Sequence, residues 1–411
     1  MALRSSTRIF ASGGPAMLQN MTRRATRTST IANEAESKTE TSRRRIERHT
    51  VRSLFGGAAI LALAGMNAPA NAADPDFSQY IEITRNAQTT PSWPGPTEPA
   101  PAPKNKFIVE ISCTHAVEGC KKNSEAIEDV AKRLGWRYKI IVVSDATGFD
   151  AAVMTGINAG ADGIILNGID TKLISGGIAS AKAKMIPIVS PQLLNEVGPY
   201  GVDADVSSDA AEVGKIIAAE AIANHNGKMH VLMLNIAEWQ LPARIMKGVK
   251  ATLDGCSKCQ ITYATPIDFT SSVIGTTLPQ QVVAAIRRDP KINVIIEGID
   301  PMANFIIPAL DAAGMRDKVK MYSSLANPGP LQLMREGNVL VADVGVSLKW
   351  GVWGAIDQMI RIMNGQPTVH QVVPVQLLTM EVPDSLPAPG TAYTSDASGF
   401  AEKYLTLWGI K

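Results

Sequence analysis

Residues 164–170 read Ile-Ile-Leu-Asn-Gly-Ile-Asp, and residues 294–300 read Val-Ile-Ile-Glu-Gly-Ile-Asp, at an offset of 130 positions. In each copy an apolar run ends in Gly-Ile-Asp, and a segment of helical length follows. A continuous apolar run is typical of a strand that is buried on both faces of a parallel sheet. Asp170 and Asp300 then fall at the carboxyl edge of a sheet, where α/β proteins bind ligands. Two such edges facing each other would form a cleft, although each aspartate could also simply cap a helix.

Predicted strands and helices alternate on both sides of these two copies. Around the first copy we expect strands at 107–112, 138–144, 185–190 and 202–206, and helices at 121–135, 149–158 and 209–224. The pattern restarts with strands at 229–235, 260–264, 319–323, 339–344 and a pair within 372–382, and helices at 241–254, 278–288, 328–337 and 350–364. Such alternation implies right-handed crossovers and parallel sheets, so the expected fold class is α/β.

The first 72 residues have the features of a secretory signal with an unusually long basic lead. Arginines within 43–52 precede a short apolar run at 54–66, and Ala70-Asn71-Ala72 follows. This combination predicts export with cleavage after Ala72. Met66 stands where a lipid-anchored protein would need Cys, so we expect the mature chain to be free in the periplasm. The choice between the Sec and the twin-arginine route, and the true start codon, are left open.

Composition argues against several classes of function. The chain has 411 residues, 45% hydrophobic and 19% charged, as in an ordinary soluble protein of two or three domains. The net charge is only +2, and many arginines lie in the export region, so the remainder is near neutral or acidic. A folded part of this charge is not expected to bind nucleic acid.

The four cysteines fall into two local pairs. Cys113 and Cys120 flank a loop, and Cys256 and Cys259 lie in Cys-Ser-Lys-Cys between a predicted helix and a predicted strand. In an oxidising compartment such pairs become disulfides. The alternative is a zinc site that gathers all four, with His115 as a further ligand. Two closed local pairs are the simpler arrangement, so we expect two disulfides and no metal.

A proline-rich segment separates the export signal from the first strand. Six prolines lie within residues 91–103, which favours an extended conformation and excludes a helix there. We expect residues 73–105 to form an amino-terminal extension on the surface, with Trp93 as its anchor.

Over residues 106–382 the order of motifs resembles that of the type I periplasmic binding proteins, the sugar-binding family that serves ABC importers. The resemblance rests on 161–167 with Asp170, 186–189, 202–209, Ala243-Arg244 with Gly248, 298–303, 334–338 and the helix 351–365. It implies two Rossmann-like lobes with parallel sheets, joined by a hinge that the chain crosses three times. It also implies a protein without catalytic activity or cofactor, which captures a small molecule between its lobes and delivers it to an ABC transporter permease.

The resemblance also implies a division of the chain. The expected parts are an export signal at 1–72, the extension at 73–105, a first lobe and hinge at 106–225 with about 350–370, a second lobe at 226–349, and carboxyl-terminal strands and tail at 371–411. The mature protein is expected to be a monomer that touches the membrane only through its transporter.

Several family positions hold residues suited to hydrogen-bonding a solute. Asp170 falls where the family has an aspartate that accepts from sugar hydroxyls, and Arg244 lies near the position of a ligand-clamping arginine. The candidate ligand contacts are Thr114, His115, Asn167, Asp170, Ser190, Trp239, Arg244, Asp300 and Ser324.

Other family positions differ. Ile299 and Val346 stand where the family has an Asn and a Gln, and Cys113 to His115 replace an aromatic pair. A buried hydroxyl without a partner costs about 1–3 kcal/mol. We therefore expect a ligand that is less hydroxylated than a free hexose, with an apolar or aromatic part.

Three tryptophans offer faces for such a part. Trp239 follows the first strand of the second lobe and is expected to stack on the ligand. For Trp350 and Trp353, packing of their helix is the favoured interpretation and ligand stacking the alternative.

Three other functions compete with solute delivery. The chain has no Gly-x-Ser-x-Gly, no Walker lysine loop and no Gly-x-Gly-x-x-Gly after a strand, which disfavours an enzyme. A transcription regulator would need a helix-turn-helix where the export segment and prolines stand. A ligand-binding sensor subunit for a membrane receptor stays open, because the sequence does not separate sensing from import.

Overall fold

The structure is a computed structural model that describes residues 76–410 except 116, 237 and 338. The predicted export signal and its cleavage position lie outside the described residues. Over the described part of the chain, no helix combines the length and the apolar character needed to cross a membrane.

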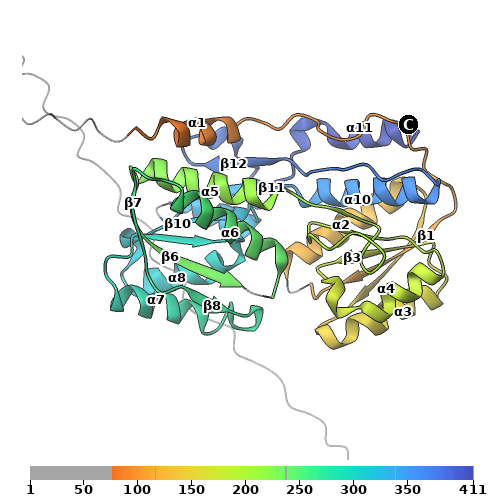
Figure 1. Cartoon of the computed structure of the whole chain (residues 1–411), viewed down its shortest axis with the longest axis horizontal. Helices are drawn as coiled ribbons and strands as arrows, with labels where there is room; N and C mark the ends of the chain where they lie inside the picture. Colours follow the sequence, from red (N-terminus) through yellow and green to blue (C-terminus); the bar gives the residue numbers. More distant parts are fainter. Residues whose placement is uncertain (1–75, 116, 237, 338, 411) are drawn as a thin grey trace, which may run out of the picture. The chain divides into compact units, whose positions relative to one another are not determined.

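The first lobe contains a five-stranded parallel sheet with the strand order β2-β1-β3-β4-β5 (Figure 1). Its strands are β1 (Phe107–Ser112), β2 (Arg137–Val142), β3 (Gly163–Asn167), β4 (Ile188–Pro191) and β5 (Ala204–Val206). Every residue of the central strands β1 and β3 is buried, as expected for strands that are covered on both faces. Asp170 therefore follows a central strand at the carboxyl edge of this sheet.

Helices cover both faces of the first sheet. They are α2 (Glu118–Arg133), α3 (Phe149–Asn158), α4 (Ser175–Ala183) and α10 (Leu348–Met363). Ile108 points to one face and packs in a core with α2 and α10, whereas its neighbour Val109 packs with α3 and α4 on the other. The alternation of side chains along a strand produces this division.

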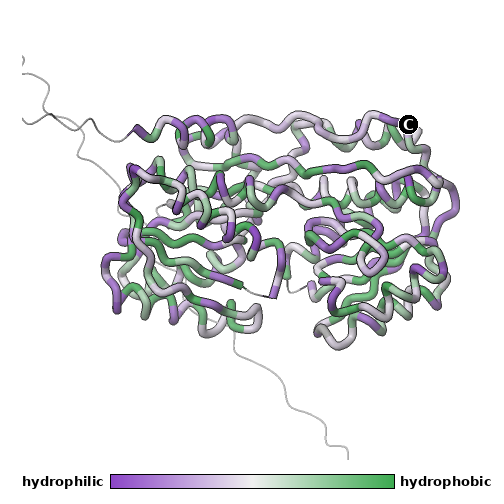
Figure 2. The backbone as a smooth tube through the Cα atoms, viewed as in Figure 1, coloured by the Kyte–Doolittle hydropathy of each residue, from purple (hydrophilic) through white to green (hydrophobic). Residues whose placement is uncertain are grey.

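The second lobe contains a seven-stranded sheet with the order β12-β11-β10-β9-β6-β7, in which β8 also pairs with β6. Its strands are β6 (Lys228–Ile236), β7 (Gln260–Tyr263), β8 (Ile267–Phe269), β9 (Val294–Glu297), β10 (Lys320–Leu325), β11 (Leu340–Val346) and β12 (Val375–Thr379). All are parallel except β12, which pairs antiparallel with β11. β9 is wholly buried, so both copies of the repeated motif are central strands, as predicted. Figure 2 shows the strands as hydrophobic stretches between more polar loops.

The helices of the second lobe include one that the sequence analysis had grouped with the first. They are α5 (Ala210–Asn224), α6 (Gln240–Asp254), α7 (Leu278–Arg288), α8 (Ala303–Ala312) and α9 (Pro328–Glu336). α5 packs on α6, β10 and β11, although it follows β5 of the first lobe. The two helices approach so closely that a Cβ on Gly214 would lie 2.3 Å from the carbonyl oxygen of Ile245.

The chain passes between the lobes at three points that agree with the expected hinge. It leaves the first sheet after β5, returns between β11 and α10, and leaves again between α10 and β12. The first and third passages touch, because the amide of Val373 donates to the carbonyl of Ser207 at 3.0 Å.

Both ends of the described chain differ from the sequence expectation. The extension contains a helix, α1 (Ser78–Ala87), and the tail contains α11 (Phe400–Leu407), neither of which was predicted. Residues 372–382 contain the single strand β12 (Val375–Thr379) and an isolated bridge from Val372 to Ser207, instead of a strand pair. Trp93 is half-buried and stacks on Trp350 at 5.5 Å between ring centroids, so its predicted role as an anchor is confirmed.

Candidate ligand-binding site

Asp170 both caps a turn and reaches the other lobe. Its carboxylate accepts from the amide of Lys172 at 3.0 Å, at the start of a short 3-10 turn. The same carboxylate accepts from Nε2 of Gln240 at 3.0 Å, on the first residue of α6 in the second lobe. The capping and cleft interpretations of Asp170 are therefore both compatible with the structure.

Gln240 connects Asp170 to Arg244. The amide oxygen of Gln240 accepts from Nη2 of Arg244 at 3.3 Å, and the Arg244 side chain is exposed. Asp170 and Arg244 were predicted from the sequence, whereas Gln240 was not, although its place directly after Trp239 at a helix start was a usable signal. A carboxylate, an amide and a guanidinium thus lie in series between the two lobes.

A disulfide shapes the loop that follows β1. Cys113 and Cys120 lie at disulfide distance, with their Cα atoms 6.0 Å apart. A Cβ on Gly168 would lie 2.5 Å from the Cys113 sulfur, so only glycine allows the loop after β3 to pass so close. Cys256 and Cys259 form the second pair, with Cα atoms 5.4 Å apart.

We expect a thiol titration of the denatured protein, purified under oxidising conditions, to detect no free thiol without reductant and four thiols after reduction. The expectation follows from the two pairs, which leave no free cysteine. Detection of four thiols before reduction would contradict both pairings.

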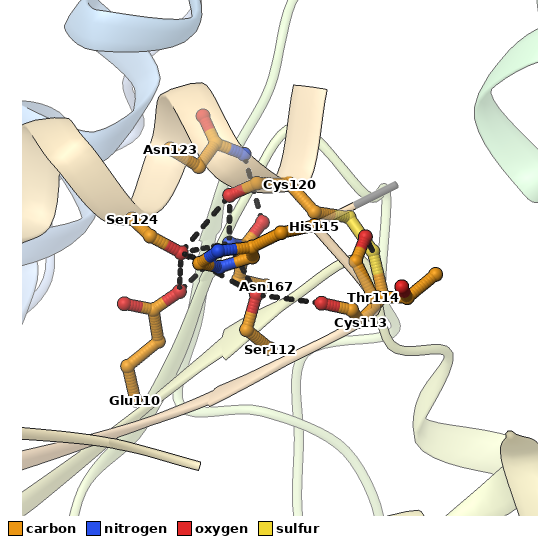
Figure 3. Close-up of a disulfide and its surroundings, with 9 residues drawn as sticks. All are labelled: Glu110, Ser112, Cys113, Thr114, His115, Cys120, Asn123, Ser124 and Asn167. Atoms are coloured by element: carbon orange, nitrogen blue, oxygen red, sulfur yellow. Dashed lines mark hydrogen bonds between the residues drawn. A yellow bond between two sulfur atoms is a disulfide. The ribbon is translucent and has the colours of Figure 1, made fainter. Parts of the chain in front are cut away.

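Behind the disulfide, Asn167 is the centre of a buried hydrogen-bond network (Figure 3). Its side chain is 0% exposed. Its amide nitrogen donates to Glu110 and to the carbonyl of Cys120, both at 2.7 Å, and its oxygen accepts from Asn123 at 3.0 Å. The structure thus gives Asn167 internal partners that brace the loop, and its contact with a ligand stays a prediction.

His115 lies at the surface of the same network. Its Nε2 is 3.1 Å from Oγ of Ser124, and the Ser124 hydroxyl donates to Glu110 at 2.6 Å. Because that hydroxyl proton is used, Nε2 has to be the donor, and Nδ1 is an acceptor while the ring is neutral. Thr114 is half-buried beside the disulfide, on the side away from this network (Figure 3).

The other polar candidates brace loops. Ser190 is 0% exposed and donates to Asp205 at 2.5 Å. Ser324 is also 0% exposed and donates to the carbonyl of Gly298 at 2.7 Å. Asp300 accepts from the backbone and side-chain nitrogens of Asn327 at 2.7 and 2.6 Å. These side chains are buried within their own lobes, whereas Asp170 reaches the other lobe. The repeated motif predicts the position of Asp300 after its strand but not its burial.

Three buried acids lie at the carboxyl edge of the second sheet. Glu297, Asp300 and Asp343 are each 0% exposed. Burial, then the nearby charge of Asp300, raises the pKa of Glu297 and of Asp343 well above the usual range. Burial also raises the pKa of Asp300 to about 7. No group of three metal-ligating side chains in the described part of the chain could hold a metal ion.

The backbone beside these acids is in an uncommon conformation. Leu325 has φ 103° and Ala326 has φ 56°, a region that residues with a Cβ rarely adopt. The amide of Ala326 donates to Asp343 at 2.9 Å, and its carbonyl accepts from the amide of Tyr393 at 3.0 Å. The Asp343 carboxyl therefore helps to hold this turn.

Two of the three tryptophans are buried in the core, and the third is partly accessible. Trp350 and Trp353 are 1% and 0% exposed, so the packing interpretation is confirmed for both. Trp239 is half-buried at the start of α6, next to Gln240, and packs against the core of the second lobe. Trp239 is therefore more accessible than the other two rings, and its contact with a ligand stays a prediction.

A hollow of about 830 Å³ lies at the hinge. Its lining includes Ser207 and Gln371 from two passages of the hinge, and Arg244 from α6. Arg244 therefore lies between this hollow and Gln240, on the side of the second lobe that faces the first.

Comparisons with known proteins agree with a fold of two lobes joined by a hinge. A family profile described as a periplasmic binding protein domain matches residues 120–367. No curated protein sequence matches the chain. Among solved structures, an ABC transporter solute binding protein of Mycobacterium smegmatis with bound glycerol is 17% identical, with a TM-score of 0.61 over 70% of this chain and 99% of that one.

Two further solved structures are similar. The myo-inositol binding protein of Caulobacter is 19% identical, with a TM-score of 0.60 over 69% of this chain and 96% of that one. A 5-methylthioribose transporter solute binding protein of Thermotoga lettingae is 18% identical, with a TM-score of 0.59 over 73% of this chain and all of that one. At these identities the structures establish the fold, and the profile spans more than half of the sequence. The chain belongs to the periplasmic binding protein family, and its two-lobed fold is that of the solute binding proteins it resembles.

Proposed function

We propose that this protein captures a small, partly hydroxylated solute between its lobes and delivers it to an ABC importer outside the cytoplasm. The observation that supports this most directly is the Asp170–Gln240 hydrogen bond, which joins the carboxyl edge of the first sheet to α6 of the second lobe. A solute that hydrogen-bonds both residues would stabilise the closed lobes, as in hinge-type closure.

The apolar side chains at the second edge favour a ligand with an apolar part. Ile299 and Val346, 6% and 1% exposed, lie where the family has amides. Both side chains are buried in the hydrophobic cores, so this edge lacks the two amides that the family would offer to hydroxyls. Their absence favours a modified sugar or a polyol as small as glycerol over a free hexose. The similar protein that binds 5-methylthioribose shows that this fold accepts a sugar with an apolar group.

A thermal-shift series tests the proposal. Glycerol, myo-inositol, D-allose and 5-methylthioribose are added to the full protein, with amino acids and aromatic acids as comparison classes. A ligand that binds only the folded state raises the melting temperature with concentration. A shift with glycerol or 5-methylthioribose supports the proposal, whereas shifts confined to the fully hydroxylated myo-inositol and D-allose, or to the comparison classes, would refute the ligand class.

Asp170→Ala is expected to weaken binding of the solute found in this way by roughly 10- to 100-fold, because a hydrogen bond to a charged group contributes about 1.5–3 kcal/mol. Asp170 is half-buried and caps only a short turn, so the ligand-free protein should lose at most about 1 kcal/mol of stability. Calorimetry measures the affinity.

The matched control for Asp170→Ala is Asp145→Ala. Asp145 accepts from the amide of Thr147 at 3.0 Å and so caps a loop of the same lobe, without the bond to α6. Equal affinities for the parent protein and Asp170→Ala would remove Asp170 from the site.

A further inference from the structure

Two segments outside the family match run along the hinge. They are residues 76–104, before the match begins at 120, and residues 383–410, after it ends at 367. Figure 1 shows their helices α1 and α11 along one edge of the molecule, together with β12 and α10. We call these two segments together the strap.

The first half of the strap begins on the second lobe. α1 packs against α5 and β12 and buries Phe77 and Tyr80. The side chain of Gln376 in β12 donates to the carbonyl of Gln88 at 2.9 Å, just after the helix ends. This part of the strap is therefore fixed to the second sheet.

The same segment then crosses to the first lobe. Trp93 stacks on Trp350 of α10, and the Trp136 indole donates to the carbonyl of Pro103 at 2.7 Å. Arg361 of α10 donates to the carbonyl of Glu98 at 2.8 Å. One continuous stretch is thus attached to both lobes without being part of either sheet.

The second half of the strap crosses in the same direction. Tyr393 binds the second lobe through Gln376 at 3.1 Å, and the carbonyl of Thr394 accepts from Ser347, the cap of α10, at 2.5 Å. Lys349 and Asp396 form an ion pair at 3.0 Å. α11 then packs on α10, with Phe400 and Tyr404 fully buried.

The two halves are joined to each other on the first lobe. The amides of Ala100 and Ala102 donate to the carbonyls of Leu407 and Trp408 at 2.9 and 3.0 Å. The Trp93 ring also contacts Tyr404 edge-on, with centroids 4.8 Å apart. These contacts fasten both halves to the first lobe, whereas Gln88 and Tyr393 are held on the second lobe by Gln376. A rotation of one lobe against the other would therefore have to deform the stretches between these attachments or detach one end.

We propose that the strap is a conformational restraint that limits how far the two lobes open when no solute is bound. The chain makes two passages between lobes here, beyond the three of the hinge, and both are held by packing and hydrogen bonds at each end. Such a restraint narrows the range of ligand-free conformations, which lowers the ordering cost of closure.

Distance measurement between spin labels tests the restraint in the full, ligand-free protein. One label is placed at Met185→Cys, on the first lobe at a residue 90% exposed, and the other at Lys291→Cys, on the second lobe. The parent should give one narrow distance distribution. Trp93→Ala should broaden it and shift it to longer distance, and Trp93→Phe should restore most of the narrowing.

Two further variants distinguish a loss of the restraint on lobe opening from a loss of overall stability. Ala102→Pro removes the amide that donates to Trp408 within an already proline-rich stretch, and should broaden the distribution as Trp93→Ala does. Phe269→Ala, in the core of the second lobe away from the strap, should lower the melting temperature without broadening. If folded Trp93→Ala and Ala102→Pro both keep the parent distribution, or if the ligand-free parent is already broad, the strap does not restrain opening.

Discussion

Asp357→Ala is expected to lower the free energy of unfolding by about 3–5 kcal/mol, because it leaves a buried guanidinium without its partner. Asp357 is 0% exposed and accepts from Nε of Arg361 at 2.8 Å. It also accepts from Gln371 at 2.8 Å and from the Trp408 indole at 3.0 Å. One carboxylate thus joins α10, a hinge passage and the end of α11. Urea unfolding followed by circular dichroism measures the loss.

Two variants show whether the unpaired charge is the cause. Replacing Asp357 and Arg361 together by Leu and Met should recover much of the stability, because no charge is then buried alone. Asp254→Ala breaks the exposed pair with Lys250 at the same i, i+4 spacing and should cost under about 1 kcal/mol. A double variant as unstable as Asp357→Ala would show that the hydrogen bonds to Gln371 and Trp408 dominate instead.

Asp343→Asn is expected to raise the stability of the ligand-free protein at pH 8 and to change it little at pH 4, because burial raises the pKa of the carboxyl that Asn replaces. Asp343 and Asp300 are buried next to each other, and burial raises the pKa of both carboxyls. Asn resembles the protonated acid in shape and can keep the contact with the amide of Ala326.

The direction of this pH effect follows from the raised pKa values. Below about pH 4 the carboxyls are protonated in both the folded and the unfolded chain, so their contribution to the free energy of unfolding is fully present. As the pH rises from there toward about 7, the value of Asp300, the unfolded chain loses protons that the folded chain keeps. Stability is therefore lost over that window.

Urea unfolding at pH 4 and pH 8 measures the effect of Asp343→Asn. Asp384→Asn, at an exposed carboxyl, is the control and should leave the free energy of unfolding unchanged at both pH values. Equal destabilisation by Asp343→Asn at both pH values would mean that the carboxyl matters for geometry alone.

The fold was predictable because its periodic signals are strong. Both repeated strands are central and buried, and the helices at 149–158 and 278–288 have the predicted bounds. α1 and α11 were missed, since α1 is short and polar on average and α11 follows a long irregular stretch. The packing of α5 on the second sheet follows from lobe topology, which local sequence does not encode.

The candidate site was less predictable, because a motif fixes backbone position but not what surrounds a side chain. Asp170 and Asp300 end identical Gly-Ile-Asp sequences, yet one reaches across to Gln240 and the other is enclosed by Asn327 and Asp343. Asn167 was named for its place at a strand end, but the disulfide-closed loop surrounds it with partners. Gln240 belongs to no motif that the sequence shows, and its contact with Asp170 depends on how the two lobes lie in the folded chain.

The placement of α10 also affects how the chain is made. One face of the first sheet, with Ile108 and Val189, is covered by a helix that begins 142 residues after β5 ends at Val206. At about 5–20 residues per second, a ribosome takes roughly 7–28 s to synthesise that interval. During this time the growing chain lacks the helix that completes the cover of this apolar sheet face, which favours chaperone binding to the nascent chain.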